Sequence, residues 1–429
     1  MANRRWRWYL GLLVGLILMP PLLWLLVVAI APTGWAKGKV VGILESRSGR
    51  RVSLEGLSVR LLGGIRLTNL EIGSPNDLGN PWLKAADLRL DIGPLQIVRG
   101  SFRPTRVDVD GVDLRVLRRS DGTVELADLI QPISVPSARL ITWNAKPADH
   151  VAVQVHHTTV TVLDDPTQTR LHLEDVEGEG YCEGPRAVVD RLRGNFNGGA
   201  FRFAAQLDRT ASALTLESQF RADDVNLDDG MNILSYVVPV LAGAPSAFKG
   251  RLNTDFYIQG QGATWESLFR SLAGHGVIAL NPIALDGAPL VAELSKFADL
   301  SSSRRVGSIR TDFVFKDRRI TTDHFTMNIA RLPITMSGWT DLDGRLDYRM
   351  KIQGLNDRLP DQARRLLGDL KVDVGSMTSL TLRGTLNRMV VQLNGVPIDG
   401  SVFHDVKLNR EDRDKLKLLG RQLRDKLLR

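Results

Sequence analysis

Hydrophobic and polar residues alternate along most of the chain, which is the pattern of a β-strand with one apolar face. After residue 50 the alternating apolar positions predict a first series of strands, at Val52, Leu54, Leu57, Val59, Ile65, Leu67, Leu70, Ile72, Leu88, Leu90, Ile92, Val107, Val109, Val112, Leu114 and Val116. More strands are predicted at 151–162, 169–176, 201–207 and 214–220 and between 308 and 393. The predicted fold class is therefore mainly β with minor α.

The alternation slips by one residue at a Gly or Asn in four places, at 54–59, 67–72, 109–114 and 393–398. Gly and Asn tolerate positive φ, so each slip indicates a bulge or a tight bend that keeps the same face inward. An ordinary hairpin turn is the alternative at any single place. Four copies of the pattern favour one elongated, curved, groove-like sheet.

Helical periodicity appears only in short pieces. Thr264 is a candidate N-cap for a helix with Trp265, Leu268, Phe269 and Leu272 on one face. Further short helices are predicted from Pro289 and over 360–370, and 226–240 has a broad apolar content. At the end of the chain, one helical stripe of a basic segment carries Leu416, Leu419, Leu423 and Leu427.

An apolar run precedes all of these elements. Its 23 residues from Tyr9 to Ala31, which include Leu16 and Leu25, would form a helix of roughly 34 Å and cross a bilayer. Arg4, Arg5 and Arg7 place the N-terminus in the cytoplasm by the positive-inside rule. The alternative is a signal peptide cleaved at Ala31. In either case most of the chain is extracytoplasmic.

Charge and composition exclude some functions. The net charge of +8 comes from both ends of the chain, so the balanced middle offers no basic face for nucleic acid. Cys182 is the single cysteine, which excludes an intramolecular disulfide. The sequence has no hydrolase, zinc-peptidase, Walker or C-x-x-C motif. We therefore expect neither enzymatic activity nor a metal or cofactor.

Two weak metal motifs do not change this expectation. His156 and His157 are neighbours in a predicted strand, where their side chains would point to opposite faces. The acidic spacing at 224–228 resembles a calcium loop, but its glycine is one place late and Ser235 stands where the bidentate Glu belongs.

The organisation follows from these elements. We predict a cytoplasmic tip and membrane anchor over 1–36, a β module over 37–130, a middle β region over 131–220 after a proline-containing boundary, a region of short helices and strands over 221–400, and a basic amphipathic helix over 401–429. That last helix could cap the sheet, contact anionic headgroups or bind a partner.

The predicted strands are one-sided, yet few helices are predicted to cover them. Either two sheets pack face to face, or one long sheet curls over itself and forms a groove for acyl chains. The candidate groove-lining residues are Leu54, Val59, Leu67, Ile72, Leu88, Leu90, Val107, Val109 and Leu114.

Two regions of the chain resemble the AsmA family. The first runs from the anchor through 43–59 to 107–116 and 122–129, and the second from Gly250 through 258–280 and 297–300 to 336–339 and 382–386. The resemblance implies a chorein-type groove that passes phospholipid between the inner and outer membranes. It also implies a place in the bacterial inner membrane, with a single span and the bulk of the chain in the periplasm.

The leading hypothesis is a membrane-anchored, non-enzymatic lipid-binding or phospholipid-transfer protein that contributes to outer-membrane assembly. Its expected partners are phospholipids, the inner membrane and, beyond these, outer-membrane or other envelope proteins. The alternative is an envelope scaffold that modulates outer-membrane protein assembly through protein contacts.

Overall fold

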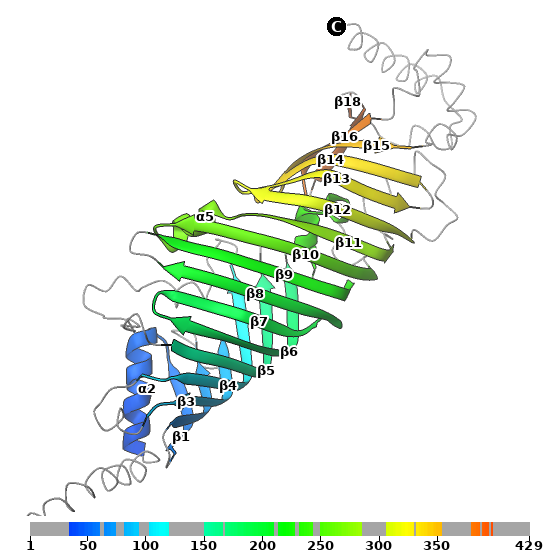
Figure 1. Ribbon diagram of the computed structural model, residues 1–429. Helices are drawn as coiled ribbons and strands as arrows, with labels where there is room; N and C mark the ends of the chain where they lie inside the picture. Colours follow the sequence, from blue (N-terminus) through cyan, green and yellow to red (C-terminus); the bar gives the residue numbers. More distant parts are fainter. Residues whose placement is uncertain are drawn as a thin grey trace, which may run out of the picture. The chain divides into compact units, whose positions relative to one another are not determined.

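A computed structural model describes residues 34–60, 64–73, 81–93, 103–119, 150–165, 168–209, 213–227, 231–242, 249–284, 306–329, 332–353, 379–386, 388–393 and 396–397. These residues form many strands and few helices, which confirms the predicted mainly-β class (Figure 1). Among them, no helix is long and apolar enough to span a membrane. The predicted anchor, the helices from Pro289 and over 360–370 and the C-terminal leucine stripe lie outside the described residues.

The chain divides into two compact units. Unit 1 comprises residues 1–166, 172–195 and 202–212, and unit 2 comprises 167–171, 196–201 and 213–429. The start of β6 and the turn that joins β7 to β8 therefore belong to unit 2, although most of β6, β7 and β8 belongs to unit 1. The five-part division of the sequence stays a prediction.

Unit 1 is built from one helix and the first eight strands. Strands β1 to β4 pair antiparallel in chain order, and β4 pairs with β5 in parallel. The elements are α2 (Gly34–Ser48), β1 (Val52–Val59), β2 (Ile65–Ile72), β3 (Leu83–Asp91), β4 (Arg106–Arg118), β5 (His150–Asp164), β6 (Thr169–Glu183), β7 (Arg186–Phe196) and β8 (Gly199–Arg209). Neither α2 nor β7 was predicted from the sequence.

A line of backbone distortions crosses the strands of unit 1. Asn69, Gly111, His157 and Asp175 all have positive φ, between 45° and 64°. The register skips Asn69 opposite Ala86, and Ala86 opposite Gly111. The slips at 67–72 and 109–114 are therefore bends within single strands, and the slip at 54–59 lies opposite the first of them in β1.

Helix α2 packs on the sheet of unit 1. The buried side chains of Val52, Leu54, Leu67, Leu70 and Ala85 form a core, against which Val40, Val41 and Leu44 of the helix pack. Two polar contacts join the helix to β1: the Val52 N–H donates to Glu45 Oε1 at 3.1 Å, and Lys37 Nζ donates to the Glu55 carbonyl at 3.2 Å.

Unit 2 continues with antiparallel strands, each paired with the next along the chain. Its elements are β9 (Leu214–Leu227), the 3-10 helices η1 (Asn232–Tyr236) and η2 (Pro239–Leu241), β10 (Lys249–Gly262), α5 (Trp265–Ser271), β11 (Ala273–Ala284), β12 (Val306–Lys316), β13 (Arg319–Ile329), β14 (Leu332–Asp341), β15 (Arg345–Ile352), β16 (Ser379–Thr385), β17 (Arg388–Leu393) and β18 (Val396–Pro397).

Three predictions from the sequence can be compared with the structure of unit 2. Thr264 caps α5 as predicted, because its side chain accepts from the Ser267 N–H in a capping box. The apolar stretch at 226–240 forms the end of β9 and two 3-10 helices. The slip at 393–398 is a hairpin, since Leu393 pairs with Val396 across a two-residue connection, so the bend interpretation was wrong there.

One face of unit 2 is closely packed. A row of side chains at matched register positions crosses six strands, through Ile278, Thr311, Phe325, Met336, Met350 and Leu380. None of these residues is more than 4% exposed. A parallel row through Leu280, Ile309, Met327, Ile334 and Ile352 is buried to the same degree. This face is therefore a dry core.

The bend at Gly111 is open to test. Its φ is +64°, and an added Cβ would lie 2.9 Å from the Ala86 Cβ. We expect Gly111→Ala to lower the free energy of unfolding by about 1–3 kcal/mol, measured by urea denaturation with circular dichroism. Gly42→Ala in α2, where nothing lies within 4 Å of the new methyl, should instead be neutral or stabilise by about 0.5–1 kcal/mol. Equal effects at both positions would contradict the bend.

His157, which lies in the same line of bends, provides a second test. Its Nδ1 lies 2.9 Å from Asp110 Oδ1, and this hydrogen bond with the charge of the carboxylate raises the pKa of the imidazole. The ion pair therefore favours the folded state at low pH, and this contribution is lost as pH rises through the raised pKa. Histidine NMR titration should give a midpoint above about 6.5, and Asp110→Asn should lower it. A midpoint that Asp110→Asn leaves unchanged would argue against this contact.

Candidate functional site

Strands β4 and β5 present an apolar face in unit 1. Their parallel register places Val107 beside Val153, Val109 beside Val155, Leu114 beside Val160 and Val116 beside Val162. All eight side chains are half-buried. We call these eight residues, with Leu173 and Leu192 described next, the apolar face.

The apolar face continues onto β6 and β7. On β6, His172 bonds to Thr161 at 3.2 Å on the polar side, so the half-buried Leu173 lies on the apolar side. On β7, a Cβ at Gly178 would meet the side chain of Leu192, which places Leu192 on this side as well.

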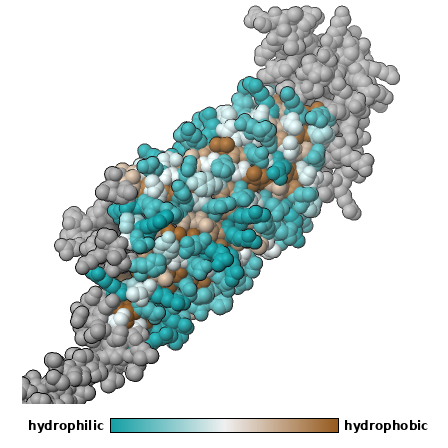
Figure 2. Space-filling view, in the orientation of Figure 1, coloured by the Kyte–Doolittle hydropathy of each residue, from teal (hydrophilic) through white to brown (hydrophobic). Residues whose placement is uncertain are grey.

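The opposite side of these strands is charged. Arg193 Nη2 contacts Glu177 and Arg191 Nη2 contacts Glu179, each at 3.0 Å, and Arg106 contacts Asp108 at 2.7 Å. Figure 2 shows a surface of the same character, with mainly hydrophilic residues and scattered apolar ones. The sheet of unit 1 therefore has one side suited to water and one suited to an apolar ligand.

The predicted groove-lining residues fall into three groups. Leu54 and Leu67 are buried in the core beneath α2, and Ile72 and Leu88 pack against that core. Val59 and Leu90 are half-buried on β1 and β3, while Val107, Val109 and Leu114 belong to the apolar face. The apolar face also contains residues that were not predicted to line a groove. Four of them lie in the alternating stretch at 151–162: Val153, Val155, Val160 and Val162. The anchor residues Tyr9, Leu16, Leu25 and Ala31 and the C-terminal leucines lie outside the described residues.

Unit 2 carries an open hollow of mixed polar and apolar lining on the side opposite its dry core. The hollow has a volume of about 520 Å³ and is lined by side chains that include Asp255, Tyr257, His275, Asp312 and His324. The rings of Tyr257 and His275 are 5.7 Å apart. Among the described residues, no group of three or more His, Cys, Asp or Glu side chains is placed to hold a metal ion. The hollow is open, and its lining combines carboxylates with apolar side chains such as Phe256, Phe313 and Val314. The carboxylates suit contact with a cationic group.

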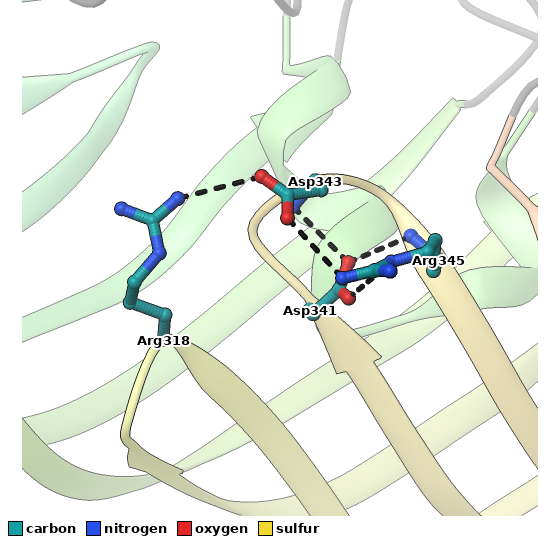
Figure 3. Close-up of polar contacts among 4 residues, drawn as sticks. All are labelled: Arg318, Asp341, Asp343 and Arg345. Atoms are coloured by element: carbon teal, nitrogen blue, oxygen red, sulfur yellow. Dashed lines mark hydrogen bonds and ion pairs between the residues drawn. The ribbon is translucent and has the colours of Figure 1, made fainter.

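A second charged cluster lies at the turn between β14 and β15 (Figure 3). Asp341 accepts from the N–H groups of Asp343 and Arg345 at 3.1 and 2.8 Å, and from Arg345 Nε at 2.7 Å. Asp343 in turn contacts Arg318 at 3.4 Å and Arg345 at 3.3 Å. Each charge has a partner within the cluster, so it holds the turn and leaves no group for a ligand.

Cys182 has no features of a nucleophile. Burial raises the pKa of its thiol, which disfavours the reactive thiolate. Among the described residues, the apolar face is therefore the candidate site, and the ten residues that define it are all Val or Leu without reactive groups.

The turn cluster gives a stability prediction. The Asp341 side chain is 10% exposed, whereas that of Asp343 is 61% exposed. Asp341→Ala should lower the free energy of unfolding by about 2 kcal/mol, because two backbone donors lose their acceptor. Asp343→Ala should cost less than about 1 kcal/mol, since only exposed ion pairs are lost. Thermal or urea denaturation would measure both, and an equal cost would refute the assigned roles.

Comparison with known proteins gives no relative on which to base an assignment. The chain matches no family model, no curated protein and no solved structure. The likeness to the AsmA family thus stays a resemblance of sequence motifs.

Proposed function

We propose that the chain is a membrane-anchored, periplasmic lipid-binding protein of the AsmA type, which takes up phospholipid for transfer and so contributes to outer-membrane assembly. The acyl chains would lie on the apolar face of β4–β7, and the headgroup would stay in water. The observation that carries this proposal is the half-buried state of those side chains, which contrasts with the dry core of unit 2.

The energetics are consistent with such a ligand. Each methylene that leaves water for an apolar surface contributes about 0.8 kcal/mol, so an acyl chain gains several kcal/mol without any directional contact. The apolar face offers only Val and Leu side chains from four strands, with no group that would select one headgroup. We therefore expect binding of several phospholipids by their acyl chains.

An envelope scaffold is the second candidate function. In the described part of unit 2 the two apolar rows are buried, and the hollow on the other side of its sheet carries carboxylates that suit a basic protein segment. Under this hypothesis partners would bind unit 2, and the chain would affect outer-membrane protein assembly without moving lipid.

The lipid hypothesis is tested by the lipid content of the purified full chain. We expect phospholipid to co-purify, as quantified by mass spectrometry of an organic extract. Val109→Thr with Val155→Thr keeps the shape of both side chains but places two hydroxyls on the apolar face. The affinity for phospholipid should fall by about 30-fold or more, and bound phospholipid per chain with it, because each of the two hydroxyls that contact acyl chains costs about 1 kcal/mol or more.

Matched controls come from the other side of β5. Thr159→Val and Thr161→Val are the reverse change on the polar side of the same strand, so the lipid content should not change. A purified chain without phospholipid, or an equal loss in both pairs of variants, would refute acyl binding at this face. Recovery of one protein partner by a lipid-free chain would favour the scaffold.

A further inference from the structure

Helix α2 has a second face that does not contact the sheet. Trp35 is 69% exposed and Ile43 is 53% exposed, although both are large apolar residues. Lys39 lies between them on the same face and is exposed as well. At 3.6 residues per turn, positions 35, 39, 43 and 46 form one continuous stripe.

This outward face is bare. At Gly34, Gly38 and Gly42, which flank the stripe, an added Cβ would meet nothing within 4 Å. The carboxylate of the helix, Glu45, points away from it and accepts from the Val52 N–H. The face therefore combines exposed apolar side chains with a lysine and no acidic residue.

We propose that the outward face of α2, formed by Trp35, Lys39 and Ile43, lies on the surface of a bilayer that contains anionic phospholipid. Trp is favoured at the level of the headgroups, and a lysine beside it attracts their phosphates. The apolar run of residues 9–31 ends three residues before Gly34, so a chain anchored by that run would hold α2 at the membrane surface. The inference rests on the proposed function for this anchor, but not on lipid binding by the apolar face.

The inference gives α2 a role on each side. Its inner side closes the core over β1–β3, while its outer side would sit among headgroups. Unit 1 would thereby be held at a fixed distance from the bilayer instead of moving freely on the tether.

The test uses the full chain reconstituted in vesicles of phosphatidylethanolamine and phosphatidylglycerol, in a Cys182→Ser background. S46C places an environment-sensitive fluorophore on the outward face of α2, and S337C places the same fluorophore on an exposed position of β14. Both changes are nearly isosteric. Spin-labelled phospholipid in the vesicles should quench the S46C probe strongly and the S337C probe little.

A second change tests the side chains themselves. Trp35→Ala with Ile43→Ala removes most of the apolar contact between α2 and the bilayer. In the S46C variant, the ratio of chains with α2 on the bilayer to chains with α2 in water should fall by about tenfold or more. Both variants retain the residues of α2 that pack on the sheet, so circular dichroism should not change.

Several outcomes would overturn the inference. Equal quenching at both positions, or a chain that does not float with the vesicles, would do so. Disulfide crosslinking between two unlabelled S46C chains, together with no quenching of the labelled variant, would show that a second copy covers this face instead. The lipid content of the purified chain, measured before reconstitution, separates the two proposals. A chain that is lipid-free before reconstitution but shows a quenched S46C probe in vesicles would refute acyl binding and support the contact of α2 with the membrane.

Discussion

Strands with a single apolar side impose one demand on this chain: that side must be shielded from water. The described residues meet the demand in two regions and leave it unmet in a third. Over β1–β3, helix α2 covers the apolar side and makes a core with Leu54 and Leu67. In unit 2 the apolar rows through Phe325 and Met327 are dry. On β4–β7 the ten side chains of the apolar face stay half-buried, and this unmet demand is the observation on which the proposal of a lipid ligand rests.

The bends make such a face possible in long strands. Side chains alternate between the two sides of a strand, so a shift of the apolar pattern by one residue would move the later apolar side chains to the other side. A bend at the place of the shift keeps them on the same side. In β4, Gly111 has positive φ and is left out of the pairing without a change of register, and the apolar alternation shifts there from Val109 to Val112. In β5, His157 does the same without the freedom of glycine, and its contact with Asp110 helps to hold that conformation.

Local sequence patterns predicted the features that depend on contacts between residues close in the sequence. Alternation located most strands, and the Thr264 cap was visible because a capping box is a contact between near neighbours. Helix α2 was missed because three glycines and two β-branched valines give it poor helix propensity; packing on β1–β3 stabilises it. The same limit applies to the site, since no local signal separates Leu54, which α2 covers, from Val109, which it does not. The pattern at 393–398 was predicted as a bend but is a hairpin. The Asn-Gly pair does not distinguish the two, because it is compatible with a bend within a strand and with a two-residue turn.

The position of α2 also constrains how lipid could reach the apolar face. The helix that would touch the bilayer closes the core at β1–β3, where Val40 and Leu44 occupy the space an acyl chain would need. Acyl chains therefore cannot bind along the first three strands without displacing α2, at the cost of exposing five buried side chains. The half-buried valines of β4 and β5 are the first part of the sheet that is free of this cover. Under the proposals above, a lipid that enters from the membrane would pass beside α2, and the helix would be both the limit of the proposed binding surface and its contact with the bilayer.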